Sequence, residues 1–509
     1  MTTVPENVTW PALIDRAKSM FPELFSKDGQ LNNLVAGAWL TGRLELECIS
    51  PVDGTRLLTL AALDRAQAEQ AVVSASNEHA SWSKLPLAER AARVQACLDE
   101  LTALRPVLIA CLTWEIGKTQ SQAANDVDRM LDGVRWYLSQ AESMLEARVA
   151  LGLISNVASW NYPFSVLFHA MLVQALAGNS VIAKTPTKGG GLALALASAL
   201  ARRCGLPLSL VNGAGGTLGE VLVAHPMVQA VAFVGGRNSG RRVEELLRPS
   251  SKRYMLEMEG VNAYGVWDFS DWTTLREQLK KGFDFAKQRC TAYVRFVVQR
   301  RLLPDFLSTY LPIVSSIRVG NPLFTYGNNS NAPDIGPLIG REKAEELRAW
   351  MDEAVRFGAF PLFAGKLDDS LFVPEQDRSA YFAPSLLLNV PRSASLYYRE
   401  PFGPLDSIVV VDTREELVAE INASGGALVA SIASDDIHFA RGVAAELRAF
   451  KVGINRIRSR GDRDEHFGGI GKSWRGCFVG GEHLVNAVTN GPEGAALYGN
   501  FEAAPQLAG

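Results

Sequence analysis

The spacing of hydrophobic and polar residues changes along the chain, and each pattern predicts a different structure. From 85 to 144, apolar residues recur three and four positions apart, which predicts amphipathic helices. From 151 onward, short apolar runs alternate with helical stretches. The runs at 181–183, 208–212 and 230–234 predict strands, and the stretches 192–203 and 218–224 predict helices. Strict alternation of this kind is typical of a parallel, doubly wound α/β sheet.

A second alternating region follows position 257. It predicts strands over 292–298, 407–411 and 427–433 and helices over 342–357 and 439–449. The pattern indicates a second α/β domain, which agrees with a length of 509 residues, too long for a single hydrophobic core. The tail from 490 to 509 is rich in glycine and alanine, so we expect it to pack on a partner or to fray.

Composition and charge narrow the class of protein. Hydrophobic residues make up 47% and charged residues 21% of the chain, and the formal net charge is −3. This balance is ordinary for a soluble protein and gives no basic surface for nucleic acid or an anionic membrane. The N-terminus lacks a signal-peptide pattern, and no apolar run reaches about 18 residues. The six cysteines show no zinc-binding spacing. We expect a cytoplasmic protein without a metal site.

Cys290 and Glu257, which are 33 residues apart, are the strongest candidates for chemistry. A thiol can attack an electrophilic carbon near neutral pH, and a carboxylate brought beside it by folding can activate a water molecule. Taken alone, a single cysteine is more often a buried, inert residue. The pair therefore indicates covalent catalysis only if other segments carry matching chemistry.

Three further segments do so, although each also has a structural explanation. Gly235 and Gly240 follow a predicted strand and open a predicted helix, where backbone N–H groups can hold a pyrophosphate, but a tight turn without a ligand has the same pattern. Asn161 lies between a strand and a proline-started helix, so its amide can bind an oxyanion or cap the helix. Lys184 follows a strand, at the sheet edge where nucleotides bind, but such a lysine is often only exposed.

Together these segments resemble the aldehyde dehydrogenase superfamily, from about 37 to 489. The matching motifs occur in the family's order: Glu115-Ile116-Gly117-Lys118, Trp160-Asn161-Tyr162-Pro163, Ala177-Gly178-Asn179 before Lys184, Gly205-Leu206-Pro207, Leu256-Glu257, Gln288-Arg289-Cys290, Glu400-Pro401-Phe402-Gly403-Pro404 and Phe467-Gly468-Gly469.

The resemblance implies a role for each matching position. Cys290 would be the nucleophile and Glu257 the general base, and Asn161 with the Cys290 backbone N–H would form the oxyanion hole. NADP or NAD would contact Trp160, Lys184, Thr187, Lys188, Gly235, Gly236, Gly240, Glu400 and Phe402. The aldehyde channel would be lined by Tyr162, Val166, His169, Arg289 and Thr291. Arg289 can pair with a substrate carboxylate, but an internal salt bridge is slightly preferred.

The resemblance also implies an architecture. The expected fold is a Rossmann-like cofactor domain (1–133 and 149–256), an α/β catalytic domain (257–472) and a small oligomerisation element (134–148 with 473–509). Only about ten residues separate 137–140 from 149–152, too few for a long two-stranded arm, so we expect a homodimer more than a tetramer.

The implied function is oxidation of an aldehyde to a carboxylic acid through a cysteine thioester. One alternative is a CoA-acylating enzyme, against which the retained Glu257 argues, and another is a degraded relative kept as a structural or binding protein. We expect NADP to be used at least as readily as NAD, because Thr187, followed by Lys188, replaces the glutamate that commonly repels a 2′-phosphate.

Four departures from the family pattern carry their own expectations. Glu259 adds a second carboxylate two residues after Glu257, and Lys287 replaces a usual glycine before the cysteine motif, which puts close backbone packing in doubt. Gly236 replaces a common serine of the phosphate turn. Phe478 replaces a glutamate found near the active site in many members, so no proton relay through that position is expected.

Overall fold

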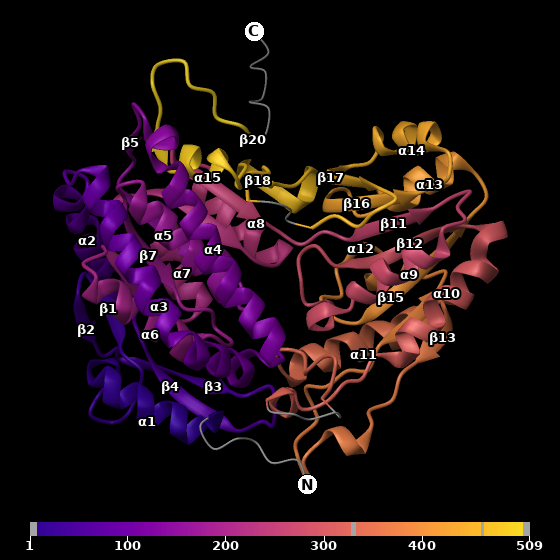
Figure 1. Cartoon of the computed structure of the whole chain (residues 1–509), viewed down its shortest axis with the longest axis horizontal. Helices are drawn as coiled ribbons and strands as arrows, with labels where there is room; N and C mark the ends of the chain where they lie inside the picture. Colours follow the sequence, from indigo (N-terminus) through magenta and orange to yellow (C-terminus); the bar gives the residue numbers. More distant parts are fainter. Residues whose placement is uncertain (1–7, 327–331, 460–462, 502–509) are drawn as a thin grey trace.

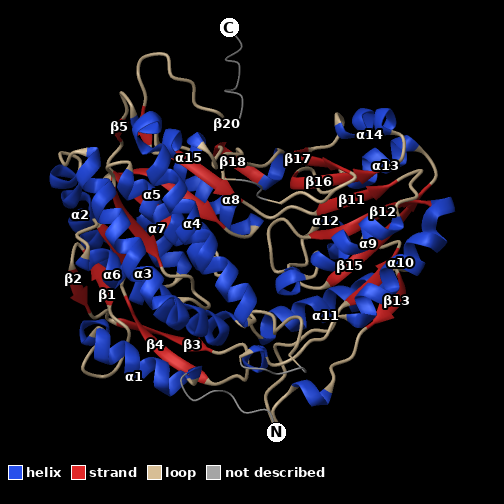
Figure 2. Cartoon of the chain, in the orientation of Figure 1, coloured by secondary structure: helices blue, strands red, loops and turns tan. Residues whose placement is uncertain are grey.

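The computed structural model describes residues 8–326, 332–459 and 463–501, and they form two α/β bodies, each built on its own sheet. In Figure 1 the sheet formed mainly by the first half of the chain lies on the left and the second sheet lies on the right. Helices cover both sheets (Figure 2). The predicted α/β class with a Rossmann-like first body is confirmed.

The first sheet has nine strands in the order β2-β1-β8-β7-β6-β9-β10-β18-β20. The central run from β8 to β10 is parallel, and the outer strands are antiparallel. The strands predicted over 181–183, 208–212 and 230–234 correspond to β7, β8 and β9. The bounds are β1 (Asn33–Val35), β2 (Ala38–Leu40), β6 (Leu153–Val157), β7 (Ser180–Lys184), β8 (Leu208–Val211), β9 (Val228–Val234), β10 (Arg253–Glu257), β18 (Trp474–Cys477) and β20 (Gly499–Asn500).

The predicted helical region from 85 to 144 is two long helices, α3 (Leu87–Ile116) and α4 (Gln120–Leu145). They separate at Gly117, whose φ of 81° is left-handed and suits glycine. Thr119 then caps α4, because its side chain accepts a hydrogen bond from the backbone N–H of Gln122. The predicted helices between the strands are α6 (Gly191–Arg203) and α7 (Gly215–Ala224), and α8 (Arg237–Leu247) follows β9.

The second sheet has seven strands in the order β13-β14-β15-β12-β11-β16-β17, all parallel except for β13. Helix α11 (Arg341–Arg356) matches its prediction. The helix predicted over 439–449 is wrong in its second half, because α14 (Ile437–Ala444) ends and β17 begins at Ala449. Val443 and Leu447 keep a helical spacing, but they are buried in one cluster through a turn. The strands are β11 (Asn262–Val266), β12 (Tyr293–Gln299), β13 (Phe360–Ala364), β14 (Ser385–Leu388), β15 (Leu405–Val411), β16 (Ala427–Ala433) and β17 (Ala449–Ile454).

The remaining elements complete the two bodies and their periphery. Two short sheets pair β3 with β4 and β5 with β19. The bounds are α1 (Trp10–Met20), α2 (Arg65–Trp82), α5 (His169–Leu176), α9 (Trp272–Lys281), α10 (Leu303–Ser316), α12 (Ser395–Tyr398), α13 (Arg414–Ile421), α15 (Glu482–Ala487), β3 (Leu44–Ile49), β4 (Arg56–Ala62), β5 (Val149–Ala150) and β19 (Thr489–Asn490). Across the described ranges, no helix combines the length and the apolar character needed to cross a bilayer.

The C-terminal segment adds two strands to the first body. Strands β18 and β20 extend the first sheet beyond β10, although the sequence grouped 473–509 with the oligomerisation element. Residues 502–509 of the tail lie outside the described residues. The domain division therefore stays a prediction. The link from β10 in the first sheet to β11 in the second determines where the site lies, because only residues 258–261 separate these two strands.

Candidate active site

The carboxyl ends of the parallel strands of the first sheet meet the second body at a cleft of about 290 Å³. Open α/β sheets bind ligands at this edge. We call this space the catalytic cleft. Ten of the residues predicted to be catalytic, cofactor-binding or substrate-binding line it: Trp160, Asn161, Tyr162, Val166, Gly235, Gly236, Glu257, Cys290, Glu400 and Phe402. Folding thus brings together residues that are up to 242 positions apart.

Cys290 lies on a loop with an unusual backbone. Phe285, Ala286 and Lys287 have φ angles of 53°, 52° and 57°, which are left-handed and rare for residues other than glycine. The loop is tied down beyond this turn, because Asn262 Nδ2 donates to the carbonyl oxygen of Cys290 at 2.7 Å. Asn262 opens β11, so the position of the cysteine is fixed by the second sheet.

Lys287 anchors the same loop from inside the protein. Its ammonium donates to both carboxylate oxygens of Asp406 (2.8 and 2.7 Å), to the carbonyl of Tyr293 (2.9 Å) and to the hydroxyl of Tyr310 (3.1 Å). Burial lowers the pKa of Lys287, whereas the Asp406 carboxylate opposes that shift. The loop thus keeps a left-handed residue without the usual glycine, because a buried charge pair holds the lysine in place.

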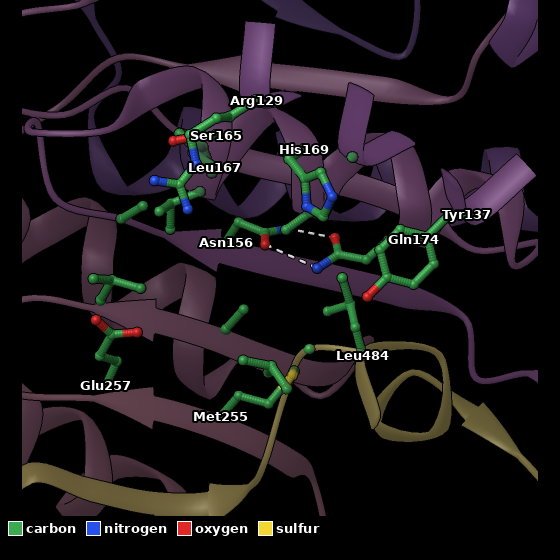
Figure 3. A pocket seen from close by; sticks show the side chains of 18 of the residues that line it. Arg129, Tyr137, Asn156, Ser165, Leu167, His169, Gln174, Met255, Glu257 and Leu484 are labelled. Atoms are coloured by element: carbon green, nitrogen blue, oxygen red, sulfur yellow. Dashed lines mark hydrogen bonds between the residues drawn. The ribbon is translucent and has the colours of Figure 1, made fainter. Parts of the chain in front are cut away.

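Glu257 lies at the end of β10 and separates two cavities. Its side chain is buried, and its Oε2 has no hydrogen-bond partner within the described part of the chain. The carboxylate borders the catalytic cleft and also a second cavity of about 370 Å³, which is shown in Figure 3. A buried carboxylate oxygen without a partner can accept a proton from a bound water molecule.

Asn161 is fixed against the cysteine loop. Its Nδ2 donates one hydrogen bond to the carbonyl of Gln288 at 3.1 Å. Gln288 is itself anchored, because its side chain donates to the carbonyl of Pro337 (3.1 Å) and accepts from the backbone N–H of Ile339 (3.0 Å). An amide nitrogen carries two N–H groups, so the second one can serve an oxyanion formed at Cys290.

The turn between β9 and α8 fits a dinucleotide in shape. Gly236 precedes α8, and its backbone is extended before the helix starts. A side chain at Gly240 would come within 2.4 Å of Met258, so only glycine allows α8 to pack this closely. A helix start facing a cavity attracts phosphate groups. The glycines therefore fit a pyrophosphate in the way that the sequence suggested.

The other predicted cofactor residues lie beyond the lining of this cleft. Lys184 ends β7, and its ammonium donates to the carbonyl of Thr185 (2.9 Å) and to the hydroxyl of Thr187 (3.0 Å). Burial lowers the pKa of Lys184 to about 8. Lys188 is exposed and forms an ion pair with Glu342 of α11 at 2.7 Å. Lys184, Thr187 and Lys188 thus lie at the end of β7 and on the loop that follows it, where a ribose can be bound.

The cleft also contains charged residues that the sequence did not single out. They are Lys343, Glu346 and Arg399, with Trp350 beside them. Lys343, Glu346 and Trp350 share a face of α11, and the helical pattern gave that helix but not the surface that it contacts. Burial raises the pKa of Glu400 well above its usual range, and the carboxylates of Glu259 and Glu257 act in the same direction.

Of the five predicted substrate residues, three line one of the two cavities and two line neither. Tyr162 and Val166 line the catalytic cleft, and Val166 and His169 line the second cavity. Arg289 and Thr291 are not among the residues that line either of these two cavities. Arg289 instead donates to the carbonyl of Gly282 at 2.9 Å and lies 3.9 Å from a carboxylate oxygen of Asp284. This arrangement matches the internal salt bridge preferred from the sequence.

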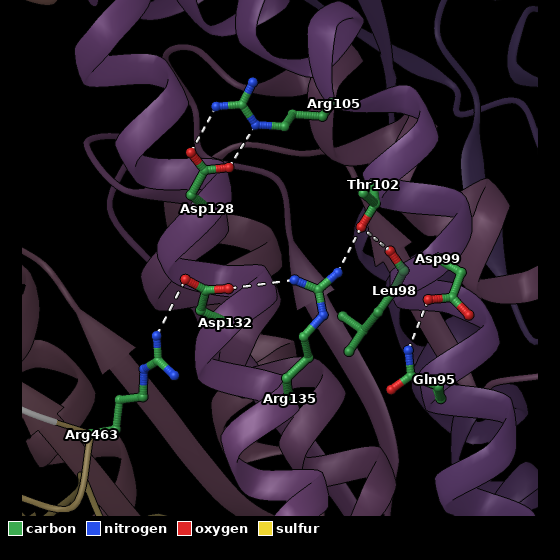
Figure 4. A network of polar contacts seen from close by, with 9 residues as sticks. All are labelled: Gln95, Leu98, Asp99, Thr102, Arg105, Asp128, Asp132, Arg135 and Arg463. Carbon is green, nitrogen blue, oxygen red and sulfur yellow. Dashed lines mark hydrogen bonds and ion pairs between the residues drawn. The ribbon is translucent and has the colours of Figure 1, made fainter.

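The second cavity has a mixed lining of polar and apolar side chains. The buried amides of Asn156 and Gln174 hydrogen-bond to each other at 2.7 and 3.0 Å and face Glu257 across the cavity in Figure 3. At the rim, Asp132 of α4 pairs with Arg463 at 3.2 Å and with Arg135 at 3.4 Å, as Figure 4 shows. This network attaches the segment that carries Arg463 to α4.

Two further expectations from the sequence concern Phe478 and metal binding. Phe478 packs against Phe450 with ring centroids 4.7 Å apart, so an apolar contact replaces the glutamate found in many family members. No metal site was predicted, but His466, Glu482 and His483 place metal-ligating atoms within 4.8 Å of one another. This cluster lies outside the lining of both cavities.

Comparisons with known proteins agree with this geometry. The model of the aldehyde dehydrogenase family matches residues 39–491. The chain is 27% identical over 485 residues to an NADP-dependent glyceraldehyde-3-phosphate dehydrogenase from Streptococcus equinus, which covers 90% of this chain and 97% of the relative. It is 25% identical over 492 residues to a 3,6-anhydro-alpha-L-galactose dehydrogenase from a Vibrio species, covering 92% and 98%.

Solved structures show the same fold. An NADP-dependent glyceraldehyde-3-phosphate dehydrogenase from Bacillus halodurans, complexed with NADP, superimposes with a TM-score of 0.81 at 25% identity, over 91% of this chain and 98% of the other. A betaine aldehyde dehydrogenase from Staphylococcus aureus in complex with NAD+ gives a TM-score of 0.82 at 23% identity, over 94% and 96%. The family match spans most of the chain, so this protein belongs to the aldehyde dehydrogenase family and is an NAD(P)-dependent oxidoreductase that acts on aldehydes.

Proposed function

We propose that this enzyme is hydrolytic: it converts its aldehyde to a carboxylic acid, with Cys290 as nucleophile and Glu257 as general base. The observation that carries the proposal is that Cys290, Glu257 and Asn161 line one cleft between the two sheets. A nucleophile, a base and an amide donor are the groups that acyl chemistry requires. The bound nicotinamide supplies the acceptor for the hydride.

The chain's own residues account for the other steps. The thiolate of Cys290 forms a C–S bond to the aldehyde carbon, and the carbonyl oxygen becomes an oxyanion. The second N–H of Asn161 and the backbone N–H of Cys290 stabilise that charge. After loss of the hydride, the acyl group remains on Cys290 as a thioester. Glu257 takes a proton from water, the resulting hydroxide attacks the thioester carbon, and the C–S bond breaks to release the acid.

The retained Glu257 favours water over CoA as the acyl acceptor. Glu257 borders both the catalytic cleft and the second cavity, and its buried Oε2 has no hydrogen-bond partner among the described residues, so this oxygen has an acceptor site left for a water molecule. We also propose that NADP is used at least as well as NAD. The support is that Lys184 donates to Thr187, and that the loop of Thr187 and Lys188 carries no carboxylate of its own to repel a 2′-phosphate.

Purified protein tests the proposal directly. Reduction of NADP and of NAD should be followed with polar aldehydes of the kinds that the relatives' names suggest, including succinate semialdehyde, lactaldehyde and glyceraldehyde 3-phosphate, with and without CoA. We expect a carboxylic acid product and no stimulation by CoA. A CoA thioester product would contradict hydrolysis, and a preference for NAD above about tenfold in kcat/KM, or about 1.4 kcal/mol, would contradict the cofactor proposal.

A further inference from the structure

The carboxylate of Glu259 lies where the glycine turn would receive a pyrophosphate. Glu259 Oε2 accepts a hydrogen bond of 3.2 Å from the backbone N–H of Arg237, the first residue of α8. Arg237 Nη2 donates in turn to the carbonyl oxygen of Glu259 at 3.4 Å. The Glu259 side chain is 18% exposed and lines the catalytic cleft. The protein thus places its own anion at the end of the helix that attracts anions.

We propose that Glu259 competes internally with the pyrophosphate of the cofactor and is a residue that sets dinucleotide affinity and selectivity. This inference rests on the proposed assignment of the catalytic cleft to NAD(P). Binding of the dinucleotide requires the Glu259 carboxylate to leave the Arg237 N–H. Arg399 can hold the displaced carboxylate, because its Nε already lies 4.0 Å from Glu259 Oε1.

The charges around Glu259 support the competition. The cleft is lined by four carboxylates (Glu257, Glu259, Glu346 and Glu400) and by the cations Lys343 and Arg399. Both cations are already engaged by Glu346, with Lys343 Nζ at 2.8 Å and Arg399 Nη2 at 3.8 Å. An incoming pyrophosphate therefore meets a carboxylate at the helix start, and the nearby cations are shared. Opposition between like charges in a partly buried cleft weakens binding.

The same geometry distinguishes Glu259 from the base. Its two carboxylate oxygens face the start of α8 and Arg399, whereas Glu257 has a buried oxygen without a partner. Glu259 is therefore assigned to the phosphate side of the cleft, where replacing it changes cofactor affinity more than the hydrolytic step.

The test is a direct measurement of NADPH binding by calorimetry, which does not depend on turnover. Glu259→Gln removes the charge but keeps the shape, and Glu259→Gly removes both. We expect the Kd of NADPH to fall about tenfold in Glu259→Gly and by a smaller factor in Glu259→Gln. Inorganic pyrophosphate, which lacks ribose and base, should compete with NADPH more strongly in both variants than in the wild type.

Asp64→Asn is the matched control. Asp64 caps α2 by accepting from the backbone N–H of Gln67 at 2.8 Å, and it is not among the residues lining the catalytic cleft. This variant makes the same charge change at another helix start, so its Kd should stay within about twofold of the wild type. Thermal melting of all variants confirms folding, and NADPH should raise the Tm most in Glu259→Gly.

The outcomes separate this inference from the function on which it rests. An NADPH Kd in the wild type that equals or lies below the values of both Glu259 variants would overturn the role of Glu259, while the cleft would still be a dinucleotide site. No NADPH binding to any of the proteins would overturn the dinucleotide assignment itself. A tighter Kd in the control variant by the same factor would show a general charge effect and would also overturn the inference.

Discussion

At the scale of single residues, the loop that carries Cys290 is held by a buried charge pair, at a position where a flexible glycine is usual in the family. Where relatives use a glycine, Lys287 adopts a left-handed φ of 57° and binds Asp406. Glu259 stands two residues after Glu257, the proposed base, and accepts a hydrogen bond from the first residue of α8. The two departures therefore act on different parts of the cleft, Lys287 on the loop that carries Cys290 and Glu259 on the turn before α8.

Lys184 predicts a pH dependence of cofactor binding. Its pKa is lowered from 10.5 to about 8 by burial, so the ammonium is charged below pH 8 and neutral above it. The Kd of NADP should be flat below that pH and should rise as pH increases through about 8. By linkage, this group makes the protein more stable as pH rises from 8 to 10.5, because the unfolded chain then holds the proton more tightly.

Calorimetric titration of NADP across this pH range checks the prediction. Lys184→Met should bind NADP weakly and without the rise, and Lys184→Arg should stay charged throughout. A Kd for the wild type that is constant through pH 8 would remove Lys184 from the cofactor site.

Site residues could be found from the sequence only where they belong to a recognisable motif. Cys290, Glu257, Asn161 and Gly235 were found because each has a characteristic neighbourhood, and they do line one cleft. Their catalytic roles stay predictions. Lys343 and Arg399 were missed, since nothing local in a helix or loop shows which distant surface a charged side chain will face.

At the scale of elements, the cysteine loop depends on the buried pair between Lys287 and Asp406. Lys287→Met leaves the Asp406 carboxylate buried without its cation, which costs about 3–5 kcal/mol. We expect the Tm to fall by roughly 3–5 °C, with loss of activity because Cys290 is displaced. Differential scanning calorimetry measures the first effect, and thiol labelling of Cys290 measures the second.

A double variant distinguishes the loss of the pair from damage to packing. Lys287→Met combined with Asp406→Leu removes both charges, so its Tm should recover most of the difference. Single and double variants with equally low Tm values would show that shape, not charge, holds the loop. A single variant with an unchanged Tm would remove the anchor from the explanation.

Secondary structure was largely predictable because the apolar runs have clear periods. The six strands predicted with ranges (β7, β8, β9, β12, β15 and β16) and helix α11 are found close to those ranges. The segment 439–449 could not be assigned correctly, because buried side chains at helical spacing occur on both sides of the turn between α14 and β17. The addition of β18 to the first sheet was also unpredictable, since pairing across more than 200 residues leaves no local signal.

At the scale of the whole molecule, the short peripheral strands predict a homodimer. Strands β5 and β19 have two residues each, and within the described ranges they pair only with one another, so they provide little edge for a larger assembly. Light scattering at micromolar concentration should give twice the mass of the 55.2 kDa chain. A mass four times that of the chain would contradict the prediction.

The meeting of the two bodies was the least predictable feature. The sequence indicated two α/β domains, but the opposition of Glu257 to Cys290 arises from the four residues that link β10 to β11 and from the contact of Asn262 with the cysteine loop. Side-chain packing between the two bodies decides how Glu257 and Cys290 are placed relative to each other. The spacing of apolar residues along the chain does not contain this information.

The central claim, that Cys290 forms a thioester which Glu257 hydrolyses, is tested most directly by stopped-flow recording of cofactor reduction in Glu257→Gln with an accepted aldehyde. The account predicts a burst close to one reduced cofactor per active site, followed by slow turnover, because the thiol still attacks but water is no longer activated. Cys290→Ala, as control, should bind NADPH and show neither phase. Near-normal steady turnover in Glu257→Gln without a burst would contradict the account.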